Sequence, residues 1–224
     1  MGIKNKTTAI RDRFRFLVEG GDYEAIVDEL DVFIKVKVDF NLRTPSEGSK
    51  RKNNGATFLE WLNYNNFLPE MIKVLEAGAD PNLKNLRGAT LLGNCSASSP
   101  QTVELLLLHG ADPNLPGREG MTPLQIAISN LAEVGAPLCV KHLLAHGADP
   151  ELVGGRWGGF GKNNPASPLR MAQALELWGK ENAEPEYAKE MGQAIVMMKA
   201  KIEEKALDDE LTAKTDAGKR NKGI

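Results

Sequence analysis

Three histidines are the first side chains in this chain that could do chemistry. His142 and His146 stand four residues apart, a spacing that places two imidazoles on one face of a helix, where they could share a metal ion. A protein zinc site needs further ligands, and the pair is accompanied neither by the glutamate of a helical zinc-binding motif nor by a third ligand. We interpret these residues as part of a helix C-terminus, which tolerates a cation, and expect no metal and no cofactor.

A glycine-rich stretch, Gly154–Lys162, ends in Gly-Lys and could suggest a phosphate-binding loop. Arg156 stands where the first glycine of that motif belongs, and Asn163 replaces the Ser or Thr that holds magnesium. No strand is predicted before it, and no helix begins directly after it. We therefore reject nucleotide binding for this stretch.

Two cysteines, Cys95 and Cys139, are too few for a disulfide framework or a four-ligand zinc site, so we interpret both as reduced thiols in the core. The net charge is −2, so no global field draws the chain to nucleic acid. The apolar run Leu105–Leu108 is far too short to cross a bilayer. Residues 1–17 contain no uninterrupted signal-peptide core. We expect a cytoplasmic protein with no membrane association and no catalytic centre.

The dominant pattern is an internal repeat. Glu76–Asn82, His109–Asn114 and His146–Glu151 are almost identical in sequence, and their glycines lie at 78, 110 and 147. Upstream of each, a second motif begins with a glycine, at 55, 88 and 120, followed two residues later by threonine. Two motifs that recur in phase about every 33 residues indicate stacked supersecondary units.

Each unit has the signals of a helix pair closed by a turn. Thr57, Thr90 and Thr122 are placed to cap the helix that follows them. Apolar residues then recur at helical spacing, as in Val103, Leu106 and Leu107. The glycines at 78, 110 and 147 come where a helix ends in the left-handed conformation that glycine adopts without strain.

The Gly-x-Thr-Pro-Leu start and the Leu-Leu-x-x-Gly-Ala-Asp-x-Asn end resemble the ankyrin repeat. Gly120–Ala127 is the most similar copy, with Gln125 where the family usually has histidine, whereas Phe58 and Leu91 replace the proline in the other two. The resemblance is specific over about residues 55–150. It implies an all-α solenoid of about five helix-pair repeats, joined by short hairpin-like turns.

The expected organisation is a single domain over residues 1–205. Its capping repeats cover about 6–41 and 165–205, and its internal repeats about 55–85, 86–117 and 118–151. Residues 206–224 are polar and aperiodic, so we predict a disordered tail. Two inter-repeat loops are enlarged: Asn41 to Thr57 spans 16 residues where Asn82 to Thr90 spans eight, and Asp149 to Ser167 spans 18 where Asp80 to Thr90 spans ten.

The resemblance further implies binding of another protein through a concave face, made by the turn tips and the first helices. The equivalent positions, together with the glycine-flanked side chains of the second enlarged loop, are Asn53, Asn54, Ala56, Tyr64, Leu86, Arg87, Ala89, Arg118, Glu119, Met121, Arg156, Trp157, Phe160 and Lys162. Arginine, tyrosine and tryptophan among them are residue types enriched at interface hot spots. We expect a monomer in the free state that acts as an inhibitor, an immunity-type protein or an adaptor.

Two alternatives stay open, loop-mediated nucleic-acid binding and a host-directed secreted effector. An enzyme is disfavoured, because the two insertions offer Glu47, Arg43, Arg156 and lysines but no His, Cys or Asp. The aromatic side chains of the second loop also allow two interpretations. They either contact a partner or fold back over the apolar edge of the last repeat.

The substitution Trp157→Ala separates these two interpretations. If Trp157 contacts the partner, its loss weakens binding by about 2 kcal/mol or more and leaves the melting temperature nearly unchanged. Isothermal titration calorimetry and a thermal melt measure the two quantities. A variant that melts several degrees early and still binds at full strength would show that Trp157 covers the core instead.

Overall fold

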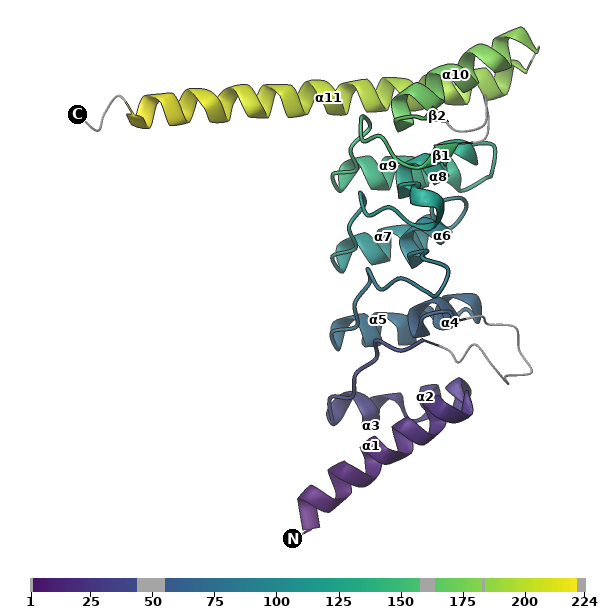
Figure 1. Cartoon of the computed structure of the whole chain (residues 1–224), viewed down its shortest axis with the longest axis vertical. Helices are drawn as coiled ribbons and strands as arrows, with labels where there is room; N and C mark the ends of the chain where they lie inside the picture. The colour runs from purple at the N-terminus through teal and green to yellow at the C-terminus, as the bar shows by residue number, and fades with distance from the viewer. Residues whose placement is uncertain (1, 44–54, 158–163, 183, 221–224) are drawn as a thin grey trace.

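The chain forms a column of stacked helix pairs in the computed structural model, which describes residues 2–43, 55–157, 164–182 and 184–220 (Figure 1). Apart from the two-residue strands β1 and β2, the described elements are helical, which confirms the predicted solenoid class. The elements, in chain order, are α1 (Gly2–Gly20), α2 (Tyr23–Asp28), α3 (Leu30–Lys35), α4 (Phe58–Tyr64), α5 (Leu68–Glu76), α6 (Leu91–Cys95), α7 (Pro100–Leu108), the 3-10 turn η1 (Arg118–Gly120), α8 (Pro123–Ser129), α9 (Ala136–Ala145), β1 (Arg156–Trp157), β2 (Asn164–Pro165), α10 (Pro168–Glu181) and α11 (Pro185–Arg220).

The first helix of each repeat begins at the threonine or serine that the repeat pattern places there. Thr57 Oγ1 accepts the backbone N–H of Glu60 at 3.1 Å, and Thr122 Oγ1 accepts that of Gln125 at 3.3 Å. Thr90 and Ser167 cap α6 and α10 in the same way. These caps satisfy backbone donors that would otherwise lack a partner at the helix start, and they confirm the predicted starts.

The second helix of each internal repeat ends at its glycine. Gly78, Gly110 and Gly147 have φ angles of 97°, 85° and 90°, as predicted. After each glycine the chain turns back, and the N–H of the following alanine bonds to a carbonyl five residues earlier; Ala111 to Leu106 O, at 2.9 Å, is one such bond. In the N-terminal repeat Lys37 occupies the same position with a φ of 55°, a conformation that costs more for a residue with a side chain.

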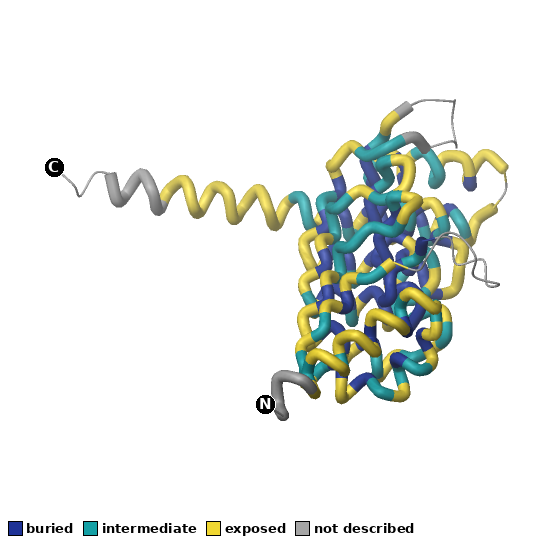
Figure 2. Tube along the Cα trace, turned by 60° about the horizontal axis from the view of Figure 1, so that its bottom comes forward, coloured by how far each residue is buried: buried dark blue, intermediate teal, exposed yellow. Residues whose placement is uncertain are grey.

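The core runs without interruption along the column, between the first and second helices (Figure 2). Its largest fully buried side chains are Ile26, Phe33, Phe58, Leu62, Met71, Leu92, Leu106, Leu124, Ile128, Leu131, Leu143 and Met171. Trp61 is buried in an aromatic cluster with Tyr23 and Phe67. Trp178, near the end of α10, is 40% exposed and lies edge-on to Tyr187.

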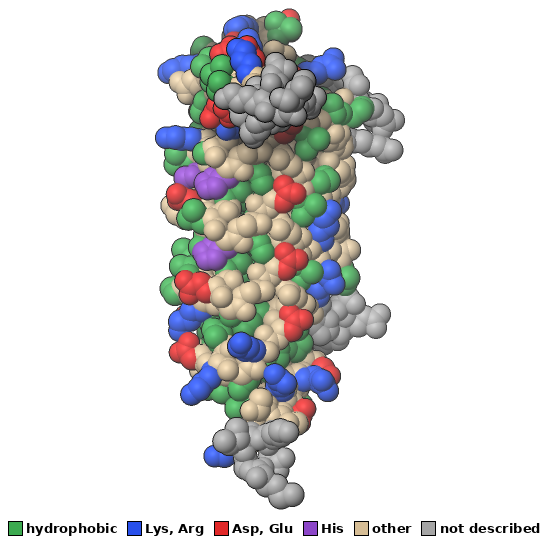
Figure 3. Space-filling model, turned by 90° about the vertical axis from the view of Figure 1, so that its left-hand side faces the viewer, with side chains coloured by type: hydrophobic (Ala, Val, Ile, Leu, Met, Phe, Trp, Pro, Cys, Tyr) green, Lys and Arg blue, Asp and Glu red, His purple; other side chains and the backbone are tan. Residues whose placement is uncertain are grey.

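Successive turns are joined by one asparagine side chain each. Asn82 Oδ1 accepts the N–H of Asp112 at 2.8 Å, while its Nδ2 donates to the carbonyl of Gly110. Asn114 does the same one repeat further on, with Asp149 N–H at 2.7 Å and Gly147 O at 2.9 Å. We call this series the asparagine ladder. It runs along the face of Figure 3, where acidic side chains of the turns form a column.

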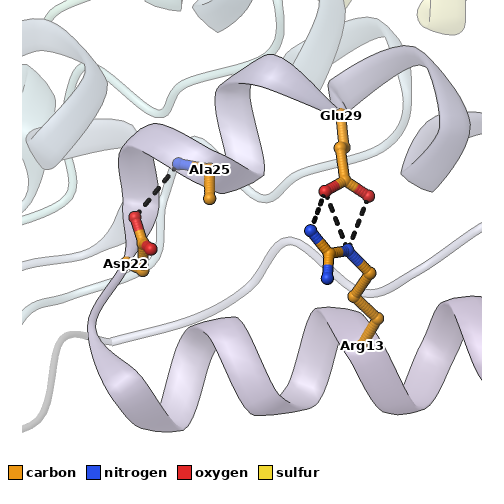
Figure 4. Close-up of polar contacts among 4 residues, drawn as sticks. All are labelled: Arg13, Asp22, Ala25 and Glu29. Atoms are coloured by element: carbon orange, nitrogen blue, oxygen red, sulfur yellow. Dashed lines mark hydrogen bonds and ion pairs between the residues drawn. The ribbon is translucent and has the colours of Figure 1, made fainter.

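The N-terminal cap consists of α1 packed on the short helices α2 and α3. Arg13 of α1 donates from Nε to both carboxylate oxygens of Glu29 at 2.8 Å, and Asp22 caps α2 by accepting the N–H of Ala25 (Figure 4). The hydrogen bonds from Arg13 lower the pKa of Glu29. This ion pair fixes α1 across the point where the second helix of the repeat is interrupted.

The C-terminal end differs from the predicted disordered tail. Helix α11 has 36 residues and continues to Arg220, so no change in structure marks residue 206. Polarity suggested disorder, but residues 206–217 are mostly good helix formers without glycine or proline. The ion pair of Lys214 with Glu210, at 2.6 Å and a spacing of four residues, supports the same conformation.

The asparagine ladder predicts a specific loss of stability for Asn114→Ala. The substitution leaves the Asp149 N–H and the Gly147 carbonyl without their partner, so we expect the free energy of unfolding to fall by about 2 kcal/mol. Urea denaturation followed by circular dichroism measures it. Glu151→Ala is the matched control, because Glu151 takes the ladder position of the next turn and its side chain is exposed. Equal effects of the two substitutions would contradict a stabilising role for the ladder.

Candidate partner-binding surface

The turn between the first two internal repeats projects two exposed side chains. Asn85 Oδ1 accepts the backbone N–H groups of Arg87 and Ala89 at 2.9 and 3.0 Å, which closes the turn and leaves Leu86 and Arg87 at its tip. The N–H of Leu86 donates to the carbonyl of Gly55 at 3.1 Å. A Cβ at Gly55 would lie 2.3 Å from the Leu86 side chain, so glycine is needed there for the tip to pack. Ala89, also predicted for the binding face, is buried.

The next turn, η1, presents Arg118 and Glu119 in the same way. Both side chains are exposed and form an ion pair at 3.5 Å, whereas Met121 is half-buried against the core. Glu119 has a φ of 61°, held by the hydrogen bond from Gly117 N–H to Met121 O at 2.8 Å. We use the name inner face for the surface made by these turn tips and the first helices α4, α6 and α8.

A pocket of about 320 Å³ opens on the inner face where α4 and α6 meet. It brings together three predicted residues from two repeats, Ala56, Tyr64 and Arg87. Tyr64 is 80% exposed, far more than its neighbours on α4. The other residues that line the pocket are Glu60, Trp61, Asn63, Asn85, Leu91, Asn94, Cys95 and Ser99.

Glu60 organises the floor of this pocket. Its Oε2 accepts the backbone N–H of Thr57 at 2.7 Å, and its Oε1 accepts the side-chain amides of Asn85 and Asn94, both at 2.8 Å. Glu60 as a residue is only 9% exposed, so these three donors replace the water that a buried charge would otherwise lose. One buried side chain thus fixes a helix start, a turn and the neighbouring helix.

The amides around Glu60 leave groups open toward the pocket. Asn63 Oδ1 accepts the hydroxyl of Thr102 at 2.9 Å, and within the described residues its Nδ2 has no partner. Asn94 uses Nδ2 on Glu60, and within the same part of the chain its Oδ1 has none. With the Arg87 guanidinium and the Tyr64 hydroxyl, the pocket can both donate and accept hydrogen bonds, as a polypeptide backbone requires, and its donors suit a carboxylate, which only accepts.

The second enlarged loop begins and ends against the third internal repeat. The N–H of Gly155 donates to Gly120 O at 2.7 Å, and Gln125 Nε2 donates to Ala166 O at 2.6 Å. A Cβ on Gly155 would lie 1.7 Å from the carbonyl oxygen of Glu119, so the loop needs glycine to lie this close. Strands β1 and β2 then pair antiparallel, which places the base of the loop beside the tip of η1.

Several predicted contact residues lie partly or wholly outside the described part of the structure. The backbone of Arg156 and Trp157 forms β1, but their side chains lie outside the described part of the structure. Phe160, Lys162, Asn53 and Asn54 lie outside the described residues altogether. Their role in binding stays a prediction from sequence.

Catalytic chemistry has little support in the described residues. Burial raises the pKa of Cys95, which lines the pocket, to about 12, and that of Cys139 to about 11, so neither is a ready thiolate nucleophile. His146 Nδ1 lies 2.9 Å from the carbonyl of His142 in its own helix. Within the described ranges no three His, Cys, Asp or Glu side chains gather as metal ligands would. No described helix is both long enough and apolar enough to cross a membrane.

Capped helix pairs, left-handed glycine turns and an exposed row of turn tips define a helical-repeat binding scaffold. A family model described as ankyrin repeats, in three copies, matches residues 49–153. Residues 49–153, just under half of the chain, thus match the ankyrin-repeat family, whose repeats typically serve as protein–protein interaction modules.

Curated relatives match parts of the chain. Cyclin-dependent kinase 4 inhibitor B of Mus musculus and that of Rattus norvegicus are each 52% identical over 42 residues, 19% of this chain and 32% of theirs. A putative ankyrin repeat protein of Rickettsia felis is 37% identical over 92 residues, 36% of this chain and 39% of its own length. The chain thus spans about a third of the length of the curated relatives it matches.

The solved structure of an ankyrin repeat domain from Acinetobacter baumannii superposes with a TM-score of 0.52. The match covers 75% of each chain at 20% sequence identity. At this identity the likeness concerns the fold.

Sequence reasoning missed the polar floor of the pocket. Glu60 follows Thr57 by three residues, which is the capping-box spacing, so its bond to the Thr57 N–H could have been predicted. Its bonds to Asn85 and Asn94 could not, because they depend on how one repeat stacks on the next. Asn63 carried no sequence signal at all.

The state of the cysteines can be tested with Ellman's reagent at pH 8. Because burial shields both thiols and raises their pKa values, we expect the folded protein to react slowly and the denatured protein to release two equivalents. Absorbance at the released thiolate band measures the rate. Rapid reaction of one equivalent in the folded state would show an accessible, activated thiol and reopen the question of catalysis.

Proposed function

We propose that the chain binds a partner protein on its inner face, and that the pocket between α4 and α6 holds a segment of the partner's backbone or an acidic side chain. Arg87 and Tyr64 stand at its rim, and the amides of Asn63 and Asn94 supply a donor and an acceptor beside them. Arginine and tyrosine are the residue types that most often carry binding energy at protein interfaces.

The observation that carries this proposal is the buried Glu60 network. A set of polar groups held by a carboxylate with three hydrogen bonds is preorganised, so little ordering entropy is lost when a partner binds. A plain solvated surface would not need a buried charge to position its amides. The network therefore favours recognition over a purely structural role for this face.

An inhibitory role is the mode of binding we favour. The support is the likeness to cyclin-dependent kinase 4 inhibitor B, 52% identical over 42 residues. An ankyrin array without catalytic groups in its described part can act by occupying its partner's surface.

A photo-crosslinking experiment tests where the partner binds. p-Benzoylphenylalanine replaces Tyr64 in one variant and His146 in the control, and each is irradiated in a lysate of the native cell. We expect a protein adduct from position 64 and none from position 146, which directly follows the second helix α9 and lies outside the inner face. An adduct with nucleic acid, or an adduct only from position 146, would contradict the proposal.

Calorimetry with the partner identified in this way measures the contribution of the rim. Arg87→Glu replaces a donor with a like charge near Glu60, and we expect binding to weaken at least about tenfold, or ~1.4 kcal/mol. The control Glu151→Ala should bind within about twofold of the wild type, since an exposed charge outside the pocket contributes little. Unchanged affinity for Arg87→Glu would exclude the pocket from the interface.

A further inference from the structure

The distal half of α11 extends beyond the solenoid. Every residue from Glu203 to Lys214 is exposed, and the helix projects away from the column at its C-terminal end (Figures 1 and 2). The part before it is different, because Met191, Ile195 and Met198 are buried against the neighbouring helices. A helical segment of this length without tertiary packing is only marginally stable in water. The distal half thus lacks the support that holds the other helices.

Apolar side chains form a stripe on the solvent side of α11. Val196 is 67% exposed, Leu207 58% and Leu211 54%, and the exposed Ala200 lies between them. Spacings of 4, 7 and 4 residues keep these positions on one face of a helix. This face is opposite the side that Met198 buries. Exposed apolar stripes of this kind are typical of a surface that another helix covers.

Carboxylates flank the stripe on both sides. Glu203 and Glu210 follow one edge at a spacing of seven residues, and Glu204 and Asp208 follow the other at a spacing of four. The segment 203–214 holds five carboxylates and two lysines. Both lysines are already engaged, Lys205 with Asp149 at 3.4 Å and Lys214 with Glu210 at 2.6 Å.

Three of the carboxylates are open to a partner. Glu203, Asp208 and Asp209 form no ion pair with any other described residue. An apolar stripe with acidic borders is complementary to a helix that has an apolar stripe with basic borders. A second copy of α11 would instead set carboxylates against carboxylates, which is unfavourable.

We propose that the distal half of α11 is a second docking surface, separate from the inner face, and that its occupant is a basic amphipathic helix of a partner protein. Leu207 and Leu211 supply the apolar contact, and Glu203 and Asp208 pair with the partner's lysines or arginines. Binding gives the distal half the packing that it lacks in the free chain.

A designed helix serves as the probe. A fluorescein-labelled 18-residue peptide of leucine and lysine, with leucines at helical three- and four-residue spacing, is titrated with the full chain and followed by fluorescence anisotropy. A peptide of the same composition with scrambled order controls for charge alone. We expect the ordered peptide to bind at least about tenfold more tightly, because only it presents an apolar stripe.

Two leucine substitutions localise the binding. Leu207→Asp should weaken binding of the ordered peptide at least about tenfold. Leu177→Asp, at a leucine of α10 that is 57% exposed, should keep the affinity within about twofold of the wild type. Circular dichroism checks that both variants fold. Hydrogen exchange of the wild-type chain should show new protection over residues 203–214 when the ordered peptide is present, since the free segment opens easily.

Three outcomes would overturn the proposal. Equal binding of the ordered and scrambled peptides would show that the surface attracts the peptide through charge alone. Equal effects of the two leucine substitutions, or protection outside α11, would place the peptide elsewhere. Sedimentation equilibrium that shows a dimer of the chain alone, made monomeric by Leu207→Asp, would make a second copy the occupant.

Discussion

Asparagine side chains join successive turns of this solenoid, and the placement of the other elements depends on that spacing. Asn82 and Asn114 each accept an N–H from the following turn and donate to its glycine carbonyl. Because this N–H and this carbonyl both belong to the backbone of the following turn, the two hydrogen bonds fix the position and the orientation of that turn. The turn tips then lie at regular intervals along the inner face, and the pocket can form between two repeats.

The ladder also explains why the C-terminal end is built differently. The turn that follows the one with Asn114 has Glu151 at the ladder position, so the bridging amide is missing there. Here α11 contacts the turn instead, since Lys205 of α11 forms an ion pair with Asp149. A helix replaces a turn as the neighbour, and a helix can continue past the edge of the column.

Much of the fold was predictable because its signals are local. The caps at Thr57, Thr90 and Thr122 and the left-handed glycines depend on residues within one turn of chain. The bonds of Glu60 to Asn85 and Asn94 join residues 25 and 34 positions apart, so only the stacked structure shows them. The helical continuation after residue 205 was not predicted, because the polar composition of this segment suggested disorder.

The position of Glu60 links stability to recognition. In the third internal repeat Gln125 holds the same place after its threonine, but its amide donates to Ala166 and so fastens the C-terminal cap. In the repeat between them the position is Gly93, which has no side chain to contribute. One structural position therefore serves the cap in one repeat and the pocket in another. Because solenoid repeats couple mainly to their neighbours, the pocket between α4 and α6 and the distal half of α11 can change independently.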